Sequence, residues 1–354
     1  MPSGYPGHGF PLQPQPPKRG NGWKWALGGV AILAVIGVTA AVTVAVVKTS
    51  DGGGPDSPTA TPSTASASTV THPDIASAND TGPVAVILED PSCATRYPVL
   101  STFESRTKNG WDKRDPKLAA PDWTPEVRSQ YEAAGQAFRD AADQIIPSAK
   151  LTPHRGMRQL YEQFIAYARE YADSIPAYTP VDNQLALATI SASDAIDRIC
   201  AAIGYGSAAA RGPLVPALQT PSEVAPVRDP DDAEKLLDEP NPVCPEWDSA
   251  LEHFLATSEP WRATNPDSPR AEWSSEQEKA TDEAVPAMRL FNTQLSSFGR
   301  QSENPTLRDL ANLAVQYRQA YLESIPTYTP ADKYLVDASI RISSLVAAAC
   351  RALG

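Results

Sequence analysis

Residues 167–185 read Y-A-R-E-Y-A-D-S-I-P-A-Y-T-P-V-D-N-Q-L, and residues 317–335 read Y-R-Q-A-Y-L-E-S-I-P-T-Y-T-P-A-D-K-Y-L. The two stretches share two tyrosines, a Ser-Ile-Pro, a Tyr-Thr-Pro, an aspartate and a leucine at an offset of 150 residues. The same offset joins Trp111 to Trp261. Repetition at one fixed interval predicts a single structural module that is present in two diverged copies.

Composition divides the rest of the chain into segments. Many of the 35 prolines in the 354 residues lie in the first 65 positions and around 212–245, which are poor core material. We predict a Pro/Gly-rich cytoplasmic arm without ordered structure (1–24), a transmembrane helix (25–47), an unstructured Ser/Thr/Pro stalk (48–83), a first helical repeat (84–205), a linker (206–235) and a second helical repeat (236–354).

The segment 25–47 carries no charged side chain. As a helix it would extend roughly 34 Å, which is enough to cross the hydrocarbon core of a membrane. Lys18, Arg19 and Lys24 precede it and only Lys48 follows closely, so we expect the N-terminus in the cytoplasm. Because no small-residue cleavage signal precedes Lys48, an uncleaved anchor is favoured over a signal peptide. The predicted location is the cell membrane, with the C-terminal region extracytoplasmic.

Each repeat reads as four helices. In the first repeat, the second helix opens at Thr124 with proline at the next position, and the other copy opens at Ser274 with Gln277 in capping-box spacing. A stripe of apolar and aromatic side chains at helical spacing predicts the third helix over 153–174. Neither copy shows alternating strand residues. The predicted class is all-α, with one transmembrane helix followed by two tandem disulfide-closed up-down four-helix bundles.

The chain has four cysteines, which allow three pairings. In an up-down bundle the start of the first helix and the end of the fourth lie at the same end. This topology predicts the bonds Cys93–Cys200 and Cys244–Cys350, and an extracytoplasmic compartment would permit them. Free buried thiols are the alternative. A metal site is disfavoured, because no Cys-x-x-Cys pair or nearby histidine accompanies these residues.

Charge and motifs restrict the function. The formal net charge is −12, and no acidic residue precedes Asp51, so the chain after the apolar segment is acidic. An acidic exterior argues against a nucleic-acid partner. No His-x-x-x-His, Gly-x-Ser-x-Gly or phosphate-loop motif occurs. We therefore predict that the protein is not an enzyme and needs no cofactor.

Repeated aromatic residues form the predicted ligand groove. Tryptophan and tyrosine offer large faces with a polar edge, which suits them to ligand binding. The alternative is structural: such residues also close a helix hairpin or fasten a long loop to a bundle. The six positions are Trp111, Tyr171 and Tyr178 in the first repeat and Trp261, Tyr321 and Tyr328 in the second.

The first 80 or so residues carry a resemblance. Residues 18–25 read K-R-G-N-G-W-K-W, between a Pro/Gly-rich arm and an Ala/Val-rich apolar segment, and a Ser/Thr/Pro stalk follows. This layout resembles that of proline-rich, single-pass membrane proteins of unknown function found in mycobacteria and related actinobacteria. The resemblance implies a cell-envelope location and carries over no catalytic or binding residue.

The functional prediction is a membrane-anchored extracytoplasmic binding or scaffold protein of the cell envelope. Its expected partners are the membrane and either an envelope protein or a small ligand. One alternative is an envelope enzyme with a site at the interface of the two repeats, which a cluster of buried acids with perturbed pKa values in one copy would favour. Another is a sensor that couples the ectodomain to the short arm.

Overall fold

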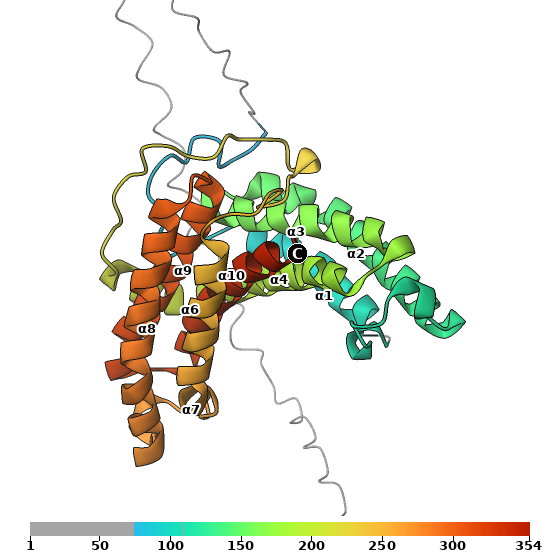
Figure 1. Ribbon diagram of the computed structural model, residues 1–354. Coiled ribbons are helices and arrows are strands. Elements are labelled where there is room, and N and C mark those ends of the chain that lie inside the picture. The colour runs from blue at the N-terminus through green and yellow to red at the C-terminus, as the bar shows by residue number, and fades with distance from the viewer. Residues whose placement is uncertain (1–73, 109) are drawn as a thin grey trace, which may run out of the picture. The chain divides into compact units, whose positions relative to one another are not determined.

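The computed structural model describes residues 74–108 and 110–354, and every regular element in these ranges is helical (Figure 1). The predicted all-α class is confirmed for this part of the chain. The predicted arm, the predicted transmembrane helix and the predicted stalk as far as residue 73 lie outside the described residues. Within the described ranges, no helix has the length and hydropathy that crossing a membrane requires.

The two repeats have matching helices. Those of the first repeat are α1 (Ser92–Thr107), α2 (Pro125–Leu151), α3 (Arg155–Ser174) and α4 (Asn183–Gly204). The linker contributes the short helix α5 (Ser207–Arg211). The second repeat contains α6 (Cys244–Thr257), the one-turn α7 (Glu259–Arg262), α8 (Ser275–Gln301), α9 (Pro305–Ser324) and α10 (Lys333–Arg351).

Side-chain caps set the start of the long second helix in each repeat. The Thr124 hydroxyl accepts a hydrogen bond from the Val127 amide at 3.3 Å, and Ser274 accepts one from the Gln277 amide at 3.3 Å. The predicted capping box at Ser274 is only half formed. The Gln277 side chain donates instead to the Asn265 carbonyl at 2.9 Å, which holds the preceding loop against α8.

The repeated Tyr-Thr-Pro turn ends one helix and begins the next. After α3 and α9 the chain tightens into 3₁₀ turns at Ile175–Ala177 and Ile325–Thr327, because proline lacks the amide that a continuing helix needs. Asp182 and Asp332 then accept hydrogen bonds from the backbone amides of the turn threonines, at 2.7 and 2.8 Å. These reciprocal caps start the 3₁₀ turns Pro180–Asp182 and Pro330–Asp332, which lead directly into α4 and α10.

The predicted disulfide pairing is confirmed. Cys93 bonds to Cys200 and Cys244 bonds to Cys350, with Cα–Cα separations of 5.4 and 5.5 Å. Each bond joins the first helix of a repeat to the last. Within each repeat, long helices that are consecutive in sequence contact each other, and the first contacts the last. That each repeat closes as an up-down bundle stays a prediction.

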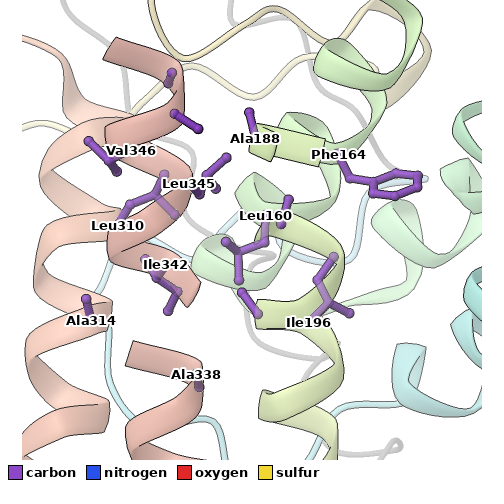
Figure 2. Close-up of a cluster of buried hydrophobic side chains, with 14 of the residues drawn as sticks. Leu160, Phe164, Ala188, Ile196, Leu310, Ala314, Ala338, Ile342, Leu345 and Val346 are labelled. Carbon is purple, nitrogen blue, oxygen red and sulfur yellow. The ribbon is translucent and has the colours of Figure 1, made fainter. Parts of the chain in front are cut away.

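The two repeats share one core. The most extensive helix–helix contact in the described residues joins α4 of the first repeat to α10 of the second. Figure 2 shows that apolar side chains from both repeats meet there, including Ala188 and Ile196 from α4 and Ile342 and Leu345 from α10, all fully buried. Residues 74–354 accordingly belong to a single compact unit. The tandem copies are therefore halves of one fold.

A buried ion pair crosses between the repeats. The Arg155 guanidinium donates to both carboxylate oxygens of Asp309, at 2.8 and 3.1 Å, and the two side chains are 1% and 5% exposed. Gln159 donates to the same carboxylate at 2.9 Å. Gly156 allows the close approach of α3 and α9, since a Cβ there would lie 3.2 Å from a Leu313 methyl carbon. The third long helix of each repeat, α3 and α9, thus contacts its counterpart through both polar and apolar side chains.

The predicted stalk ends earlier than expected. The prediction places residues 74–83 in the stalk because they contain few large apolar residues. In the structure, however, Ile75 is buried, and the Ala76 amide donates a hydrogen bond to the Lys150 carbonyl at 2.9 Å. Asp80 accepts a hydrogen bond from the Arg155 amide at 2.7 Å. These ten residues contain few large apolar side chains, and hydrogen bonds to α2 and α3 attach them to the folded unit.

The segment predicted as a solvated linker packs on the second repeat. Arg211, at the end of α5, donates to Asp332 at 3.1 and 3.0 Å and to the Thr327 hydroxyl and carbonyl at 2.8 and 2.9 Å. At the other end of the linker, Arg169 of α3 donates to the Asp231 side chain at 2.9 Å. The Pro/Ala/Asp-rich composition gave no indication of these contacts, because they depend on single charged residues.

The core of the second repeat contains a buried cation at a position where the first repeat has alanine. Arg318 is fully buried, and its guanidinium carbon lies 4.4 Å from the centroid of the Phe291 ring. It donates to the Asn292 side-chain carbonyl at 2.9 Å, and no carboxylate in the described ranges forms an ion pair with it. The corresponding positions in the first repeat are Ala168 and Ala142. Burial lowers the pKa of Arg318 to about 9.

Replacing Cys93 and Cys200 together with serine should destabilise the protein by about 4–5 kcal/mol, because the bond closes a loop of more than 100 residues in the unfolded chain. Urea denaturation followed by circular dichroism measures this change. With all four cysteines replaced, a reductant should have no further effect. Equal urea midpoints for the wild type and the Cys93/Cys200 variant would contradict the prediction.

Replacing Arg318 with methionine and Asn292 with alanine should stabilise the protein at pH 7 by about 1–4 kcal/mol, because an uncompensated buried charge is removed. The lowered pKa means that the folded state disfavours the cation. The wild type should therefore gain stability as the pH rises through about 9, and the difference between the two proteins should shrink. Urea midpoints at pH 7 and pH 10 test this, and a pH-independent difference would argue against it.

Candidate functional site

The predicted groove residues form two equivalent aromatic clusters. In the first repeat the Trp111 indole N–H donates to the Tyr171 hydroxyl at 2.8 Å, and in the second Trp261 donates to Tyr321 at 2.9 Å. In both repeats the tryptophan comes from a short helical turn in the connection after the first helix, and the tyrosine comes from the third long helix. Each bond therefore fastens a long loop to the helical core.

The turn tyrosines complete both clusters. Tyr178 donates its hydroxyl hydrogen to the Pro116 carbonyl at 2.9 Å, and Tyr328 donates to the Pro266 carbonyl at 2.7 Å. Burial raises the pKa of both phenols, so they remain protonated donors at neutral pH. These contacts match the structural alternative, in which the aromatics close the hairpin corner and hold the loop.

Two large side chains fill the cluster of the first repeat. The Tyr131 ring stacks on Trp123 with a centroid separation of 3.9 Å and an interplanar angle of 27°, and Tyr131 is fully buried. The Arg114 guanidinium carbon lies 3.4 Å from the Trp111 ring centroid, and the same group donates to the Asn183 side chain at 2.7 Å. A ring and a guanidinium from the protein itself thus occupy the space between helices and loop.

In the second repeat, threonines stand at both of these positions. Thr281 corresponds to Tyr131 and Thr264 to Arg114 at the offset of 150 residues. A cavity of about 200 Å³ is present there, and both threonines line it. Aromatic and apolar side chains form much of the rest of its wall, namely Trp261, Trp273, Tyr321, Tyr328, Pro266, Val336 and Ile340. We call this cavity the second-repeat pocket.

The pocket has a hydrogen-bonded interior and a charged mouth. Thr281 already donates to the Gln277 carbonyl at 2.8 Å. Lys333 lines the pocket and pairs with Asp267, with Nζ and Oδ1 2.5 Å apart. Burial raises the pKa of Asp337, which also lines the pocket. Arg262 is exposed at the edge. The positive and negative groups nearly balance, so the pocket favours an uncharged group.

One ring in the pocket is more accessible than its counterpart. Trp123 is buried beneath Tyr131, whereas Trp273 is only partly buried because no ring covers the equivalent face. The Arg270 guanidinium carbon lies 4.8 Å from the Trp273 ring centroid and pairs with Glu278, so one side of the indole is already covered. The arrangement can hold a flat apolar group against the remaining aromatic surface.

The six predicted groove residues thus divide by repeat. Trp261, Tyr321 and Tyr328 line the second-repeat pocket, whereas Tyr131 and Arg114 fill the equivalent space in the first repeat. Trp111 also lines a different cavity of about 270 Å³, whose wall includes residues of α1 and α4. Sequence reasoning missed the two threonines. An alignment of the copies would have identified them, because a tyrosine and an arginine are each replaced by a much smaller residue at otherwise well-matched positions.

A cluster of acids, one of which also lines the second-repeat pocket, bears on the enzyme alternative. Burial raises the pKa of Asp194 and Asp197 on α4 and of Asp337 on α10. Asp197 pairs with Arg96, and Asp194 lies 3.2 Å from Arg341. The cluster therefore draws on both repeats, and two of its members are paired with arginines. In the described ranges, no group of three or more His, Cys, Asp or Glu side chains is placed to hold a metal ion.

Comparison with known proteins identifies a family and one relative. Residues 75–354 match the family described as mycobacterial ESX-1 associated protein. An uncharacterized protein of Mycolicibacterium smegmatis (strain MKD8) is 51% identical over 349 residues, which cover 98% of this chain and 91% of that protein. No solved structure shows a significant match.

Replacing Trp111 with phenylalanine should cost about 1–3 kcal/mol beyond the loss of apolar contact, because the buried Tyr171 hydroxyl loses its donor. A double-mutant cycle with Tyr171→Phe isolates this coupling. The matched cycle, Trp261→Phe with Tyr321→Phe, should give a smaller value, because water entering the second-repeat pocket can replace the lost bond. Equal coupling energies from urea denaturation would show that the two clusters are equally closed.

Proposed function

This chain belongs to the mycobacterial ESX-1 associated protein family, and we propose on that basis that it is a binding or scaffold protein that associates with components of the ESX-1 secretion system. The association with ESX-1 rests on the family to which the chain belongs, and the relative in M. smegmatis is an uncharacterized protein. We further propose that the protein is anchored by residues 25–47 in the cell membrane, with residues 48–354 extracytoplasmic.

Two features support this location. The apolar segment 25–47 is long enough to cross a membrane, and basic residues are concentrated before it. Both pairs of cysteines in the folded unit are disulfide-bonded, and such bonds persist in oxidising compartments outside the cytoplasm. We infer also that each bond closes an up-down four-helix bundle, since the first and last helices of each repeat meet where the cysteines lie.

The second-repeat pocket is the observation that supports binding. The two copies have the same hydrogen bonds that fasten the loop, so the aromatic cluster attaches the loop in the same way in both. The second copy has threonines in place of the two side chains that fill this space in the first copy. A cavity that is not needed for loop attachment costs packing energy, which gives a reason to look for a ligand.

Binding fits the described residues better than catalysis. The acids Asp194, Asp197 and Asp337 are the observation that favours the alternative, an enzyme with a site between the repeats. Arg96 and Arg341 pair with two of these carboxylates, which gives them a structural role in joining helices. The second-repeat pocket contains tyrosines that remain protonated and a lysine that is engaged by Asp267, and none of these is an activated nucleophile.

The proposed function predicts that the folded unit carries the partner contacts. Tagged full-length protein in M. smegmatis should cross-link to ESX-1 components in the membrane fraction, and deletion of residues 84–354 should abolish that capture. Deletion of residues 2–24 is the matched control and should preserve it. Quantitative mass spectrometry of the purified cross-links is the measurement. Equal capture after removal of 84–354 would refute the proposal.

A further inference from the structure

We propose that the second-repeat pocket receives one aromatic side chain, a tyrosine or a similar ring, from a partner protein. The inference rests on the proposed binding function and specifies what the pocket binds. Its basis is the internal duplication: the first repeat shows which chemical group the equivalent space accepts, and the second repeat lacks that group.

The first repeat provides the geometry of the occupied state. The Tyr131 ring stacks on Trp123 at 3.9 Å and also lies 4.9 Å from the Tyr178 ring, measured between centroids. In the second repeat Trp273 and Tyr328 remain, with centroids 5.2 Å apart, while Thr281 replaces the stacking tyrosine. Two of the three rings of the cluster are therefore present, and the position of the third is open.

The size of the pocket matches a single ring. Sites for drug-sized ligands measure about 300–1,000 Å³, whereas this cavity measures about 200 Å³. A ring in it would gain offset or edge contacts with Trp273 and Tyr328, and each such aromatic pair contributes about 0.5–1.5 kcal/mol beyond burial. A larger ligand would have to extend beyond the mouth, as a polypeptide that presents one side chain does.

The hydrogen-bonding groups of the pocket favour a ring over a cation. In the first repeat the second filling group is the Arg114 guanidinium, which donates to Asn183. The equivalent of Asn183 is Lys333, which has no acceptor atom, so an incoming guanidinium would not find this hydrogen-bond partner. In the second repeat, the space equivalent to that of Arg114 is therefore unsuited to a basic group. The space equivalent to that of the Tyr131 ring is still lined by neutral aromatic side chains.

A polypeptide source fits the surroundings of the pocket. Trp273 is partly buried, and Pro266 is exposed beside it, so the mouth offers apolar surface to the chain that carries the ring. Aromatic side chains that enter pockets are the usual anchors of protein interfaces, because they bury a large area with few rotatable bonds. A free aromatic molecule would use only the interior and leave this surface uncovered.

The first test uses p-cresol, the side-chain analogue of tyrosine, on the purified full-length protein with labelled tryptophan. The indole N–H signals of Trp261 and Trp273 should shift in a saturable manner. In Thr281→Tyr, which restores the ring of the first repeat, binding should weaken at least about tenfold, whereas Thr281→Ser should bind as the wild type does. Saturable shifts that are unchanged in Thr281→Tyr would overturn the proposal.

The reciprocal substitution in the first repeat tests the same proposal in a way that does not depend on the folding of the Thr281→Tyr variant. Tyr131→Thr should open the equivalent space, and p-cresol should then shift the Trp123 indole signal, which does not respond in the wild type. Dispersed indole signals before titration establish that each variant is folded. Failure of a folded Tyr131→Thr variant to gain a p-cresol response would show that the tyrosine-to-threonine difference does not create the site.

A second test identifies the source of the ring. Cross-linking in M. smegmatis compares the wild type with Thr281→Tyr, with Thr281→Ser as control. Loss of ESX-1 components in Thr281→Tyr alone supports a partner side chain. Binding of p-cresol with unchanged capture would overturn the partner assignment and indicate a small-molecule site. Failure of the wild type to capture any ESX-1 component would count against the proposed function, independently of the p-cresol result.

Discussion

The apolar contact between α4 and α10, with the Arg155–Asp309 pair beside it, determines the rest of this structure. Each repeat alone would expose a face of its fourth helix, and joining the copies buries both faces in one core. The ion pair is buried and receives a further hydrogen bond from Gln159, so it fixes how α3 and α9 align. Because the repeats depend on each other in this way, one copy can diverge while the other maintains the shared fold.

The two copies differ inside their cores. The second copy has threonines where the first has Tyr131 and Arg114, and it has Arg318 where the first has alanine. Both changes reduce the quality of packing, one by opening a cavity and one by burying a charge. The loop-fastening bonds of Trp261 and Tyr328 were kept. Such a pattern is expected when one half of a duplicated fold maintains stability and the other acquires a binding role.

The sequence predicted features that depend on local spacing or on the repeat itself. The helical class, the disulfide pairing and the Thr124 cap followed from these patterns. It did not predict the attachment of residues 74–83 or of the linker, because Asp80 and Arg211 find their partners far along the chain. Small residues of α4 such as Ala188 pack against α10, and spacing within one copy does not predict this contact between the copies. The six groove residues are predicted from their aromatic character, whereas the difference between the copies depends on threonines.

The attachment of residues 74–83 has a mechanical consequence. The Arg155 guanidinium that crosses to Asp309 also donates to the carbonyls of Asp80 and Gly82, and the Arg155 amide donates to the Asp80 carboxylate. Tension applied from the N-terminal side of the chain therefore reaches α2 through the Ala76–Lys150 hydrogen bond and α3 through Arg155. Because Arg155 also holds Asp309, a pull on that end would load the junction of the two halves as well as the helices of the first half.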